Sequence, residues 1–354
     1  GKSRGAGEDF IEYIVFFSRI LYTYRINFSP MRIITWNVNG IRATSNKWEL
    51  TRLIETHDPD ILFMQEIKAG HDKIPEELKN PANYRTHYNP AEKPGYAGTW
   101  VWIHERVYED FDVRFLDSFP SDPTANEGRV GHVELRMKYK WEKASELPLA
   151  KGFESALLAA NYSEAGRGDL VSEQNPPNLH PSENSFGERA LYQGGIKPIN
   201  ILDIFGIYFP NGGKSEDAWK GKIVFYSEFA KYMDALRAEW HSVLWWGDIN
   251  CAHHEIDLAR PKENDGKIGF HPVERAWLDG RVKDGWHDIW REQNPDTPEV
   301  YSWWDPVTRS RERNVGWRID ALWCEDSLLA NIRDIWYLPM QMWSDHCPMY
   351  IDIA

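Results

Sequence analysis

Several side chains able to carry hydrolytic chemistry stand where apolar, strand-like segments end. Glu66 follows the run DILFMQ, Asp248 and Asn250 follow SVLWW, and Asp345 and His346 precede the last strand-like run. Strand ends are where binding sites are commonly built. Together these residues offer oxygen ligands for a cation, a group that can deprotonate water and an imidazole for a phosphate oxygen. Those are the requirements of metal-assisted phosphodiester hydrolysis.

Further polar residues fit the same chemistry. Asn37 and Tyr208, like Asn250, can bind phosphate oxygens without adding negative charge. Asp320, inside the apolar run WRIDALW, is placed to orient and charge His346. Taken singly, each of these residues is more often a turn cap, a helix cap or a satisfied core residue. Taken together, they form a coherent hydrolytic set.

The donor types predict a hard cation. Glu66 and Asp345 supply carboxylate oxygens, which Mg²⁺ prefers, and the sequence has no thiolate cluster or three-histidine zinc set beside them. We therefore expect Mg²⁺ as the cofactor, with Mn²⁺ as the alternative. The GGK at 212–214 lacks the spacing of a phosphate-cradling loop, so no nucleotide cofactor is expected.

Strands and helices alternate along the chain in a way typical of a layered α/β fold. The strand candidates are apolar or alternating runs bounded by turn residues. They are 31–36, 60–65, 98–103, 130–137, 199–208, 242–246, 319–323 and 349–353, and the helix candidates are 47–56, 218–239 and 272–278. Because strands alternate both with helices and with hairpin-like partners, the pattern favours a mixed α/β sandwich.

Two segments depart from this pattern, and we interpret both as additions to one domain. Residues 1–30 precede the first regular strand as an N-terminal extension. Residues at about 141–196 combine a helix-prone piece with a polar, Pro/Asn/Ser-rich stretch. We expect 31–354 to form a single domain interrupted by this insertion. Since the strand after the insertion leads to Tyr208, the insertion should start roughly 30 Å from the site and pack on the distal edge of the sandwich.

The composition is that of a globular protein with an acidic balance. With 42% hydrophobic residues and 18 Trp the chain can bury a large core. Its formal net charge of −13 argues against a coat of positive charge for nonspecific nucleic-acid binding. The three cysteines, Cys251, Cys324 and Cys347, indicate neither a disulfide framework nor structural zinc. The apolar stretch 10–21 is too short and too charged to span a membrane.

Six short motifs, taken in order, resemble those of one enzyme family. They cover nearly all of 31–140 and 197–354, and six in order are far more specific than any one. The motifs are WNVNGIRA (36–43), LFMQEIKA (62–69), YFPNGG (208–213), GDINCAHHEIDLARPKEN (247–264), RERNVGWRID (311–320) and SDHCP (344–348). In these motifs the chain resembles the exonuclease III family of apurinic/apyrimidinic endonucleases.

The resemblance implies a four-layer α/β sandwich in which two mixed β-sheets pack face to face and are flanked by helices. It implies a metal-dependent endonuclease that hydrolyses the phosphodiester 5′ to an abasic site. Related 3′→5′ exonuclease and 3′-phosphodiesterase activities are common in the family. The implied partner is double-stranded DNA with abasic sites. We expect a monomer that does not associate with a membrane. Its expected location is the cytoplasm, with association with the nucleoid if the source is prokaryotic.

The resemblance also implies roles for individual residues. Glu66 resembles the principal metal ligand, Asp345 a second acidic group near the metal, and Asp248 the residue that activates the attacking water. Some members carry an aspartate at Asn39, and here that position is neutral. The implied catalytic residues are Tyr208, Asp248, Asn250, Asp320 and His346; the metal-binding residues are Asn39, Glu66, Asp248, Asn250, Asp345 and His346; the substrate-binding residues are Asn37, Asn211, Lys214, Trp303, Trp304, Trp317 and Ile319.

Apolar residues near the later motifs resemble the family's pocket for a flipped sugar without a base. Trp303, Trp304, Trp317 and Ile319 would form its walls. A base-less deoxyribose fits a small apolar pocket, whereas a normal nucleotide must bring its base at an unstacking cost of roughly a few kcal/mol. The alternative is that these tryptophans are core residues.

A run of cations predicts where DNA phosphates bind. Arg309, Arg311, Arg313 and Arg318 lie within ten residues and are opposed only by Glu312. Phosphate contacts need local rather than net positive charge, so the acidic balance of the chain does not exclude them. A solvated charge run is the alternative. Residues that extend the predicted patch are Lys214, Arg260, Lys262 and Lys267.

Two other functions fit parts of the pattern. One is a phosphoesterase of the wider superfamily acting on a small phosphorylated substrate, and the segment NVGWRID with the paired tryptophans counts against it. The other is a catalytically silent DNA- or protein-binding module on the same scaffold. The presence of Glu66, Asp248, Asn250, Asp320 and His346 together disfavours that reading.

Overall fold

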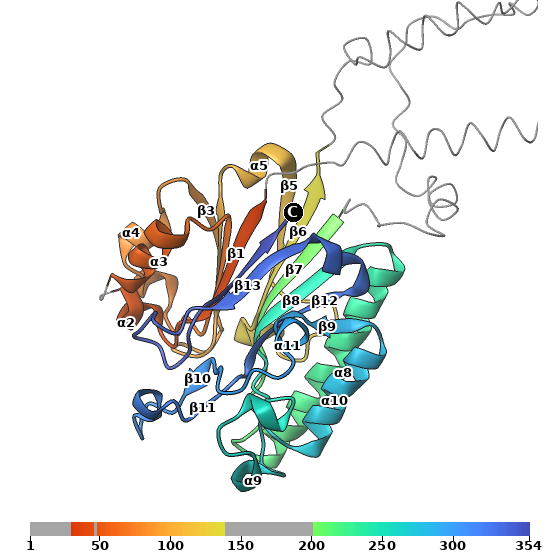
Figure 1. Cartoon of the computed structure of the whole chain (residues 1–354). Coiled ribbons are helices and arrows are strands. Elements are labelled where there is room, and N and C mark those ends of the chain that lie inside the picture. The colour runs from red at the N-terminus through yellow and green to blue at the C-terminus, as the bar shows by residue number, and fades with distance from the viewer. Residues whose placement is uncertain (1–29, 46–47, 139–200) are drawn as a thin grey trace, which may run out of the picture. The chain divides into compact units, whose positions relative to one another are not determined.

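The computed structural model describes residues 30–45, 48–138 and 201–354, and its centre is formed by two six-stranded sheets (Figure 1). The chain divides into two units, one made of Gly1–Met137 with Pro198–Ala354 and the other of Lys138–Lys197. The predicted extension at 1–30, except Pro30, and the predicted insertion at about 141–196 lie outside the described residues.

Strand β1 (Met31–Asn37) lies inside the first sheet because its sequence is apolar on both faces. Ile33 faces the second sheet, whereas Ile34 and Trp36 face the opposite way. β1 pairs in parallel with β2 and antiparallel with β14, and the sheet order is β13-β14-β1-β2-β4-β3. The other strands of this sheet are β2 (Ile61–Gln65), β3 (Tyr84–Asn89), β4 (Thr99–His104), β13 (Ile332–Tyr337) and β14 (Met349–Ile353).

The second sheet repeats this plan, with one parallel pair among antiparallel neighbours. Its order is β5-β6-β7-β8-β12-β9, and β7 and β8 are the parallel pair. β12 runs antiparallel to β8 in a register that places Asp320 opposite Asp248. The strands are β5 (Phe111–Leu116), β6 (Val130–Met137), β7 (Ile201–Tyr208), β8 (Ser242–Asp248), β9 (Trp286–Asp288) and β12 (Asp320–Glu325). A separate ribbon pairs β10 (Trp303–Trp304) with β11 (Gly316–Trp317).

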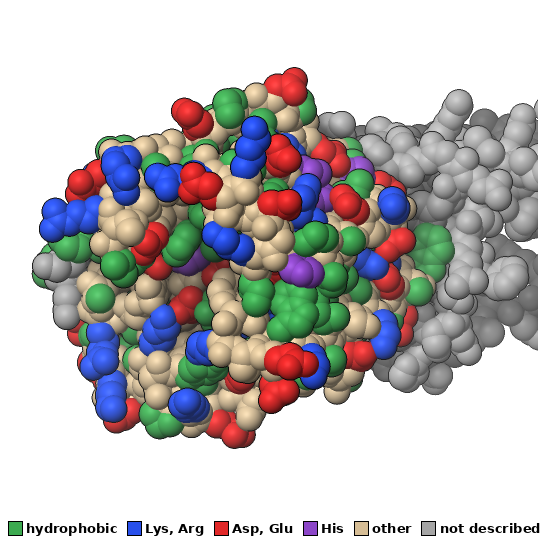
Figure 2. Space-filling view, turned by 90° about the horizontal axis from the view of Figure 1, so that it is seen from below, with side chains coloured by type: hydrophobic (Ala, Val, Ile, Leu, Met, Phe, Trp, Pro, Cys, Tyr) green, Lys and Arg blue, Asp and Glu red, His purple; other side chains and the backbone are tan. Residues whose placement is uncertain are grey.

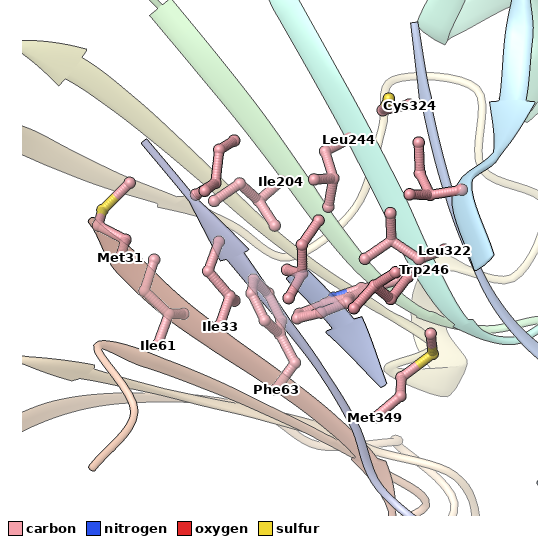
Figure 3. Packing of buried hydrophobic residues seen from close by; sticks show 14 of the residues in the cluster. Met31, Ile33, Ile61, Phe63, Ile204, Leu244, Trp246, Leu322, Cys324 and Met349 are labelled. Atoms are coloured by element: carbon pink, nitrogen blue, oxygen red, sulfur yellow. The ribbon is translucent and has the colours of Figure 1, made fainter. Parts of the chain in front are cut away.

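The main core lies between the two sheets (Figure 3). Phe63 of β2 packs edge-on against Trp246 of β8, with 5.8 Å between ring centroids. Phe63 also reaches the backbone of β7 at Gly206, where a Cβ atom would overlap the Phe63 ring. A larger residue at 206 would therefore force the two sheets apart.

Helices cover the outer faces of both sheets, so the layers run α/β/β/α (Figure 1). Ser215 caps the longest described helix, α8, by accepting a hydrogen bond from the Ala218 amide, and Phe225 and Phe229 of this helix pack against the second sheet. The helices are α2 (Ile41–Ser45), α3 (Glu49–His57), α4 (Glu76–Lys79), α5 (Val107–Asp110), α8 (Glu216–Ala238), α9 (Pro261–Asn264), α10 (Pro272–Lys283) and α11 (Ile289–Gln293).

The predicted four-layer sandwich of two mixed sheets is confirmed. Each predicted strand and helix listed above has a counterpart, and six of the described strands were not predicted: β3, β5, β9, β10, β11 and β13. Within the described ranges, no helix combines the length and the apolar character needed to cross a bilayer.

Candidate active site

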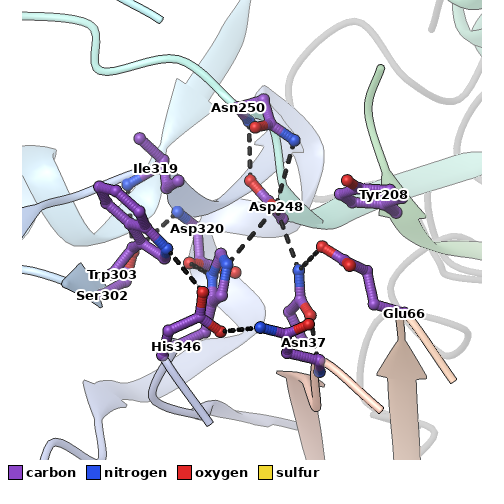
Figure 4. A network of polar contacts seen from close by, with 12 residues as sticks. Asn37, Glu66, Tyr208, Asp248, Asn250, Ser302, Trp303, Ile319, Asp320 and His346 are labelled. Carbon is purple, nitrogen blue, oxygen red and sulfur yellow. Dashed lines mark hydrogen bonds and ion pairs between the residues drawn. The ribbon is translucent and has the colours of Figure 1, made fainter. Parts of the chain in front are cut away.

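The predicted polar residues meet at one end of the sandwich, where both parallel strand pairs end (Figure 4). Asn37 ends β1 and Glu66 follows β2 in the first sheet, while Tyr208 ends β7 and Asp248 ends β8 in the second. Parallel strands bring their carboxyl ends to the same edge. The site is therefore assembled from both sheets.

The backbone at this edge turns sharply through left-handed conformations. Asn39, Glu66, Lys68 and Asn250 have φ values of 44°, 54°, 52° and 50°. Such conformations are uncommon for residues other than glycine and concentrate at functional sites. Gly247, directly before Asp248, also has a positive φ, and a Cβ there would overlap the Ile207 carbonyl oxygen. The turn that aims Asp248 at the site thus requires glycine.

Asn37 bridges the two sheets at the centre of the site. Its Nδ2 donates to Oε1 of Glu66 at 2.9 Å and to Oδ2 of Asp248 at 3.1 Å. Its Oδ1 accepts from the backbone amide of Asn39 at 3.1 Å. The amide therefore holds two carboxylates close together without adding charge.

Asp248 is buried in a set of hydrogen bonds from asparagines. Its Oδ1 accepts from the Asn250 backbone amide at 2.9 Å, and its Oδ2 accepts from the Asn250 side chain at 3.2 Å. Asn211 in turn donates to Oδ1 of Asn250 at 2.9 Å. Burial, together with the charges of Asp320 and Glu66, raises the pKa of Asp248 to about 7 although His346 opposes the shift. A carboxylate with such a pKa suits a general base.

His346 is held between two carboxylates of the second sheet. Its Nδ1 lies 2.8 Å from Oδ2 of Asp320, and its Nε2 lies 3.7 Å from Oδ2 of Asp248. Burial alone would lower the pKa of His346, but the charges of Asp320 and Asp248 raise it to about 10. The imidazole is therefore charged at neutral pH. Asp320 is itself fixed by its backbone amide, which donates to the Ser302 hydroxyl at 2.9 Å.

Tyr208 closes the site on the second sheet. Burial raises the pKa of its phenol, and the carboxylates of Glu66 and Asp248 add to this effect. The guanidinium of Arg129 lies over the Tyr208 ring, 4.6 Å from its centroid. The phenol therefore stays protonated and can donate a hydrogen bond to an anionic ligand.

The donor set fits a divalent cation. Oxygen atoms of Glu66 and Asp248 lie, together with a ring nitrogen of His346, within 4.8 Å of one another. Because His346 is charged, the two carboxylates are the groups that can ligate a cation here. A positive charge already lies beside them, because the Lys68 ammonium pairs with Oε2 of Glu66 and donates to Oδ1 of Asn39. The Lys68 ammonium thus contacts oxygen atoms of Glu66 and Asn39, and carboxylate and amide oxygens are the ligands that Mg²⁺ prefers.

Asp345 links the carboxylate cluster to a group of aromatic residues. Its Oδ1 accepts from Asn39 at 2.8 Å and its Oδ2 accepts from the Trp303 indole at 3.0 Å. Burial would raise the pKa of Asp345, but the charge of His346 and the hydrogen bonds from Trp303 and Asn39 lower it. Asp345 is therefore an ionised carboxylate between the two parts of the site.

An apolar wall stands beside the carboxylates. Trp303 lies opposite Trp317 in the β10–β11 ribbon, and both pack with Ile319. An isolated bridge between Trp303 and His346 joins this wall to the polar network. We call the cluster of Trp303, Trp317, Ile319, Ala252, Leu258 and Phe270 the apolar wall.

Trp304 does not belong to the apolar wall. It is 4% exposed and packs in the core between the sheets. Its indole donates to Oδ1 of Asn314 at 3.1 Å, and the Arg311 guanidinium lies 4.4 Å from its ring centroid. Neighbouring residues in a strand face opposite ways, so only Trp303 of the pair faces the site.

Two of the four arginines in the predicted patch, Arg311 and Arg318, have structural roles, which corrects that part of the sequence interpretation. Arg318 is 2% exposed and bonds to the carboxylates of Asp257 and Asp288. Arg311 donates to the backbone carbonyls of the loop before Asp345. Arg309 and Arg313 are exposed, as is Lys214. Figure 2, which views this end of the sandwich, shows Lys and Arg side chains interspersed with Asp and Glu rather than gathered in one patch.

Sequence reasoning missed three groups that the structure brings to the site. Lys68 touches Glu66, Arg129 lies over Tyr208, and the Ser302 hydroxyl accepts from the Ile319 and Asp320 amides. Lys68 could have been predicted from the sequence, because it follows Glu66 by two residues in the motif LFMQEIKA. Arg129 and Ser302 could not have been predicted in this way, because their partners lie far away in the sequence.

Comparison with known proteins places this geometry in a family. The model of the endonuclease/exonuclease/phosphatase family matches residues 34–346. The chain belongs to that family. It is 26% identical over 323 residues to an exodeoxyribonuclease of Bacillus subtilis, covering 91% of this chain and 99% of that protein. It is 28% identical over 326 residues to the DNA repair nuclease APEX1 of Danio rerio, covering 92% and 82%.

Solved structures of family members share the fold. The AP endonuclease LMAP of Leishmania major aligns with a TM-score of 0.66 at 21% identity, covering 92% of this chain and 87% of that one. The 3′ phosphatase NExo of Neisseria, bound to a product DNA hairpin, aligns with a TM-score of 0.63 at 19% identity, covering 92% and 99%. The resemblance predicted from the six motifs is thereby confirmed.

Proposed function

We propose that this chain is a DNA-repair nuclease that hydrolyses the phosphodiester 5′ to abasic sites in duplex DNA. It requires Mg²⁺, for which Mn²⁺ can substitute, and it also acts on 3′ ends as an exonuclease or phosphodiesterase. We further propose that it works as a monomer, with the catalytic domain formed by 31–354 apart from the insertion. The names of its relatives, an exodeoxyribonuclease and a DNA repair nuclease, support this proposal.

One observation carries the proposal, namely the continuity of the carboxylate network with the apolar wall. Asp248 faces charged His346 on one side and Asn37 on the other, and Asp345 joins this network to the Trp303 indole. A phosphoesterase that acts on small ligands needs only the carboxylate network and not the apolar wall. The apolar wall provides a surface for a sugar that carries no base.

The residues divide the chemistry of hydrolysis among themselves. Asp248, with its raised pKa, accepts a proton from the attacking water. The His346 imidazolium and the Tyr208 phenol stabilise charge on the phosphate oxygens, while Asn37 and Asn250 orient the groups around Asp248. When bound at Glu66, Mg²⁺ supplies Lewis-acid stabilisation of the same charge.

The test is cleavage of a duplex oligonucleotide with a single tetrahydrofuran abasic site. The intact duplex is the matched substrate, and each reaction is run with Mg²⁺ and with a chelator. We expect one nick 5′ to the abasic site that depends on metal. Abasic duplex that is bound but not cut would identify a silent DNA-binding module, and hydrolysis of small phosphoesters without nicking would identify the small-substrate phosphoesterase.

A further inference from the structure

A buried ion pair joins the two long helices behind the site. The Lys222 ammonium of α8 lies 2.5 Å from Oε1 of Glu274 of α10, and both side chains are 0% exposed. Removing two charges from water is costly, and buried ion pairs are often no more stabilising than apolar residues of similar size. Stability alone is therefore a weak explanation for this pair.

Lys222 holds the backbone of two asparagines of the site. Its Nζ donates to the carbonyl oxygen of Asn250 at 2.9 Å and lies 3.4 Å from that of Asn211. The side chains of these two asparagines bond to each other, and Asn250 also donates to Asp248. Asn250 has a left-handed backbone, with φ of 50°, and the ammonium on its carbonyl helps to hold that conformation.

Glu274 holds the loop that backs the apolar wall. Its Oε2 accepts from the amides of Gly269 at 2.7 Å and His271 at 3.0 Å. The Gly269 carbonyl accepts from the Ala252 amide at 2.8 Å, and a Cβ at Gly269 would lie 3.4 Å from the Trp317 ring. The carboxylate therefore fixes how closely this loop approaches Trp317.

We propose that Lys222 and Glu274 are positioning residues that set Asn250 and Asn211 at a fixed distance from the apolar wall. Both side chains are fully buried, so neither is exposed to a ligand in the site. The proposal rests on the proposed function, because it assigns the pair to the same hydrolytic site. Through Asn250 the pair orients Asp248, and through Gly269 it orients Trp317. Proton acceptance and sugar binding are thus aligned by one ion pair.

Two double variants separate positioning from folding. Lys222→Met with Glu274→Leu removes both charges and both hydrogen-bonding groups, whereas Lys222→Gln with Glu274→Gln removes the charges but keeps hydrogen bonding. Neither leaves an unpaired buried charge, so both should fold. We expect the Met/Leu variant to lose about tenfold or more in kcat for abasic cleavage, since small misplacements of reacting groups are costly. The Gln/Gln variant should recover at least about threefold of this loss.

The Mg²⁺ concentration for half-maximal rate provides the specific readout. It should change less than kcat does in both variants, because the pair acts on Asp248 only through Asn250 and Glu66 lies on the other sheet. Asp203→Asn, which perturbs a buried network on the outer face of the second sheet, controls for lost stability. The proposal is overturned if the Met/Leu variant keeps wild-type kcat or if the Gln/Gln variant is no more active than the Met/Leu variant. It is also overturned if both variants fail to fold. Absence of abasic cleavage by the wild-type protein would instead refute the proposed function.

Discussion

The Trp303 indole donates a hydrogen bond of 3.0 Å to Oδ2 of Asp345. An aromatic residue of the apolar wall thus also fixes an acidic residue of the site. Trp303→Phe keeps the ring but deletes this donor. We expect abasic cleavage to fall by about tenfold, because a hydrogen bond to a charged group contributes roughly 1.5–3 kcal/mol. Single-turnover cleavage of the tetrahydrofuran duplex measures this, and an unchanged rate would limit Trp303 to its apolar surface.

Asp248 is the proposed proton acceptor, so its charge should matter for rate rather than for binding. Asp248→Asn keeps the size of the side chain, and we expect folding and DNA affinity to stay close to wild type. The cleavage rate should fall by roughly a hundredfold or more because the proton acceptor is lost. Gel-shift binding and single-turnover cleavage measure the two properties. A variant with more than about a tenth of wild-type activity would exclude the role.

Glu66 and Lys68 should affect metal binding in opposite directions. Glu66→Gln weakens a ligand, so the Mg²⁺ concentration needed for half-maximal rate should rise severalfold. Lys68→Met removes the ammonium that pairs with Glu66, so Mg²⁺ should bind more tightly to the protein without DNA. Calorimetric titration of the free protein tests both. If neither variant changes the titration, the metal binds elsewhere.

Trp317 tests whether the apolar wall selects abasic sites. Trp317→Ala should reduce abasic cleavage by about tenfold more than removal of ordinary 3′ nucleotides, since only the base-less sugar is proposed to fill the wall. Parallel assays on the two substrates with one enzyme preparation give the ratio. Equal losses on both substrates would identify Trp317 as a core residue.

A histidine–aspartate network should make stability depend on pH. Asp203 is buried and lies 2.6 Å from both His132 Nε2 and His241 Nδ1. Burial would raise the pKa of Asp203, but the hydrogen bonds from the two histidines lower it. Its stabilisation is therefore complete above the unfolded pKa of about 3.9 and is lost as pH falls through the lower folded value.

Asp203→Asn is the matching variant. We expect it to lower the free energy of unfolding by about 3 kcal/mol at pH 7. This difference from wild type should shrink as pH falls below about 4, because Asp203 of the unfolded wild-type chain then takes up a proton while the folded protein still keeps it ionised. Urea unfolding across this pH range measures it. A difference that stays constant down to pH of about 3 would show that charge on Asp203 is not involved.

The strands that carry the site could be predicted because they are buried on both faces. β2 is a continuous apolar run, β1 and β8 are mostly apolar, and each of the three ends in a polar residue. β3 and β13 could not be found in this way, since their residues mix polar and apolar types without a clean alternation. Both lie at sheet edges, where one side of the strand has no neighbour to pair with.

The roles of Arg318 and Trp304 show why local pattern is insufficient at the site itself. Arg318 stands in a run of arginines, yet its partners are Asp257, 61 residues away, and Asp288, 30 residues away. No local feature distinguishes this buried arginine from an exposed one. Likewise, the pair Trp303-Trp304 does not indicate which ring faces the site, because that depends on how β10 pairs with β11.

The register of β6 with β7 has a consequence for how this chain can be altered. Arg136 lies opposite Ile201, at the end of the sheet away from Tyr208, so the chain leaves one strand and returns on its immediate neighbour. If a tight turn replaced everything between them, β6 and β7 would form an ordinary hairpin. The connection between β6 and β7 is therefore a position where an insertion leaves the sheet intact. The segment between Arg136 and Ile201 can therefore be lengthened, exchanged or deleted during evolution without a change to any strand that ends at the site. For the same reason, a reporter domain can be inserted there by protein engineering.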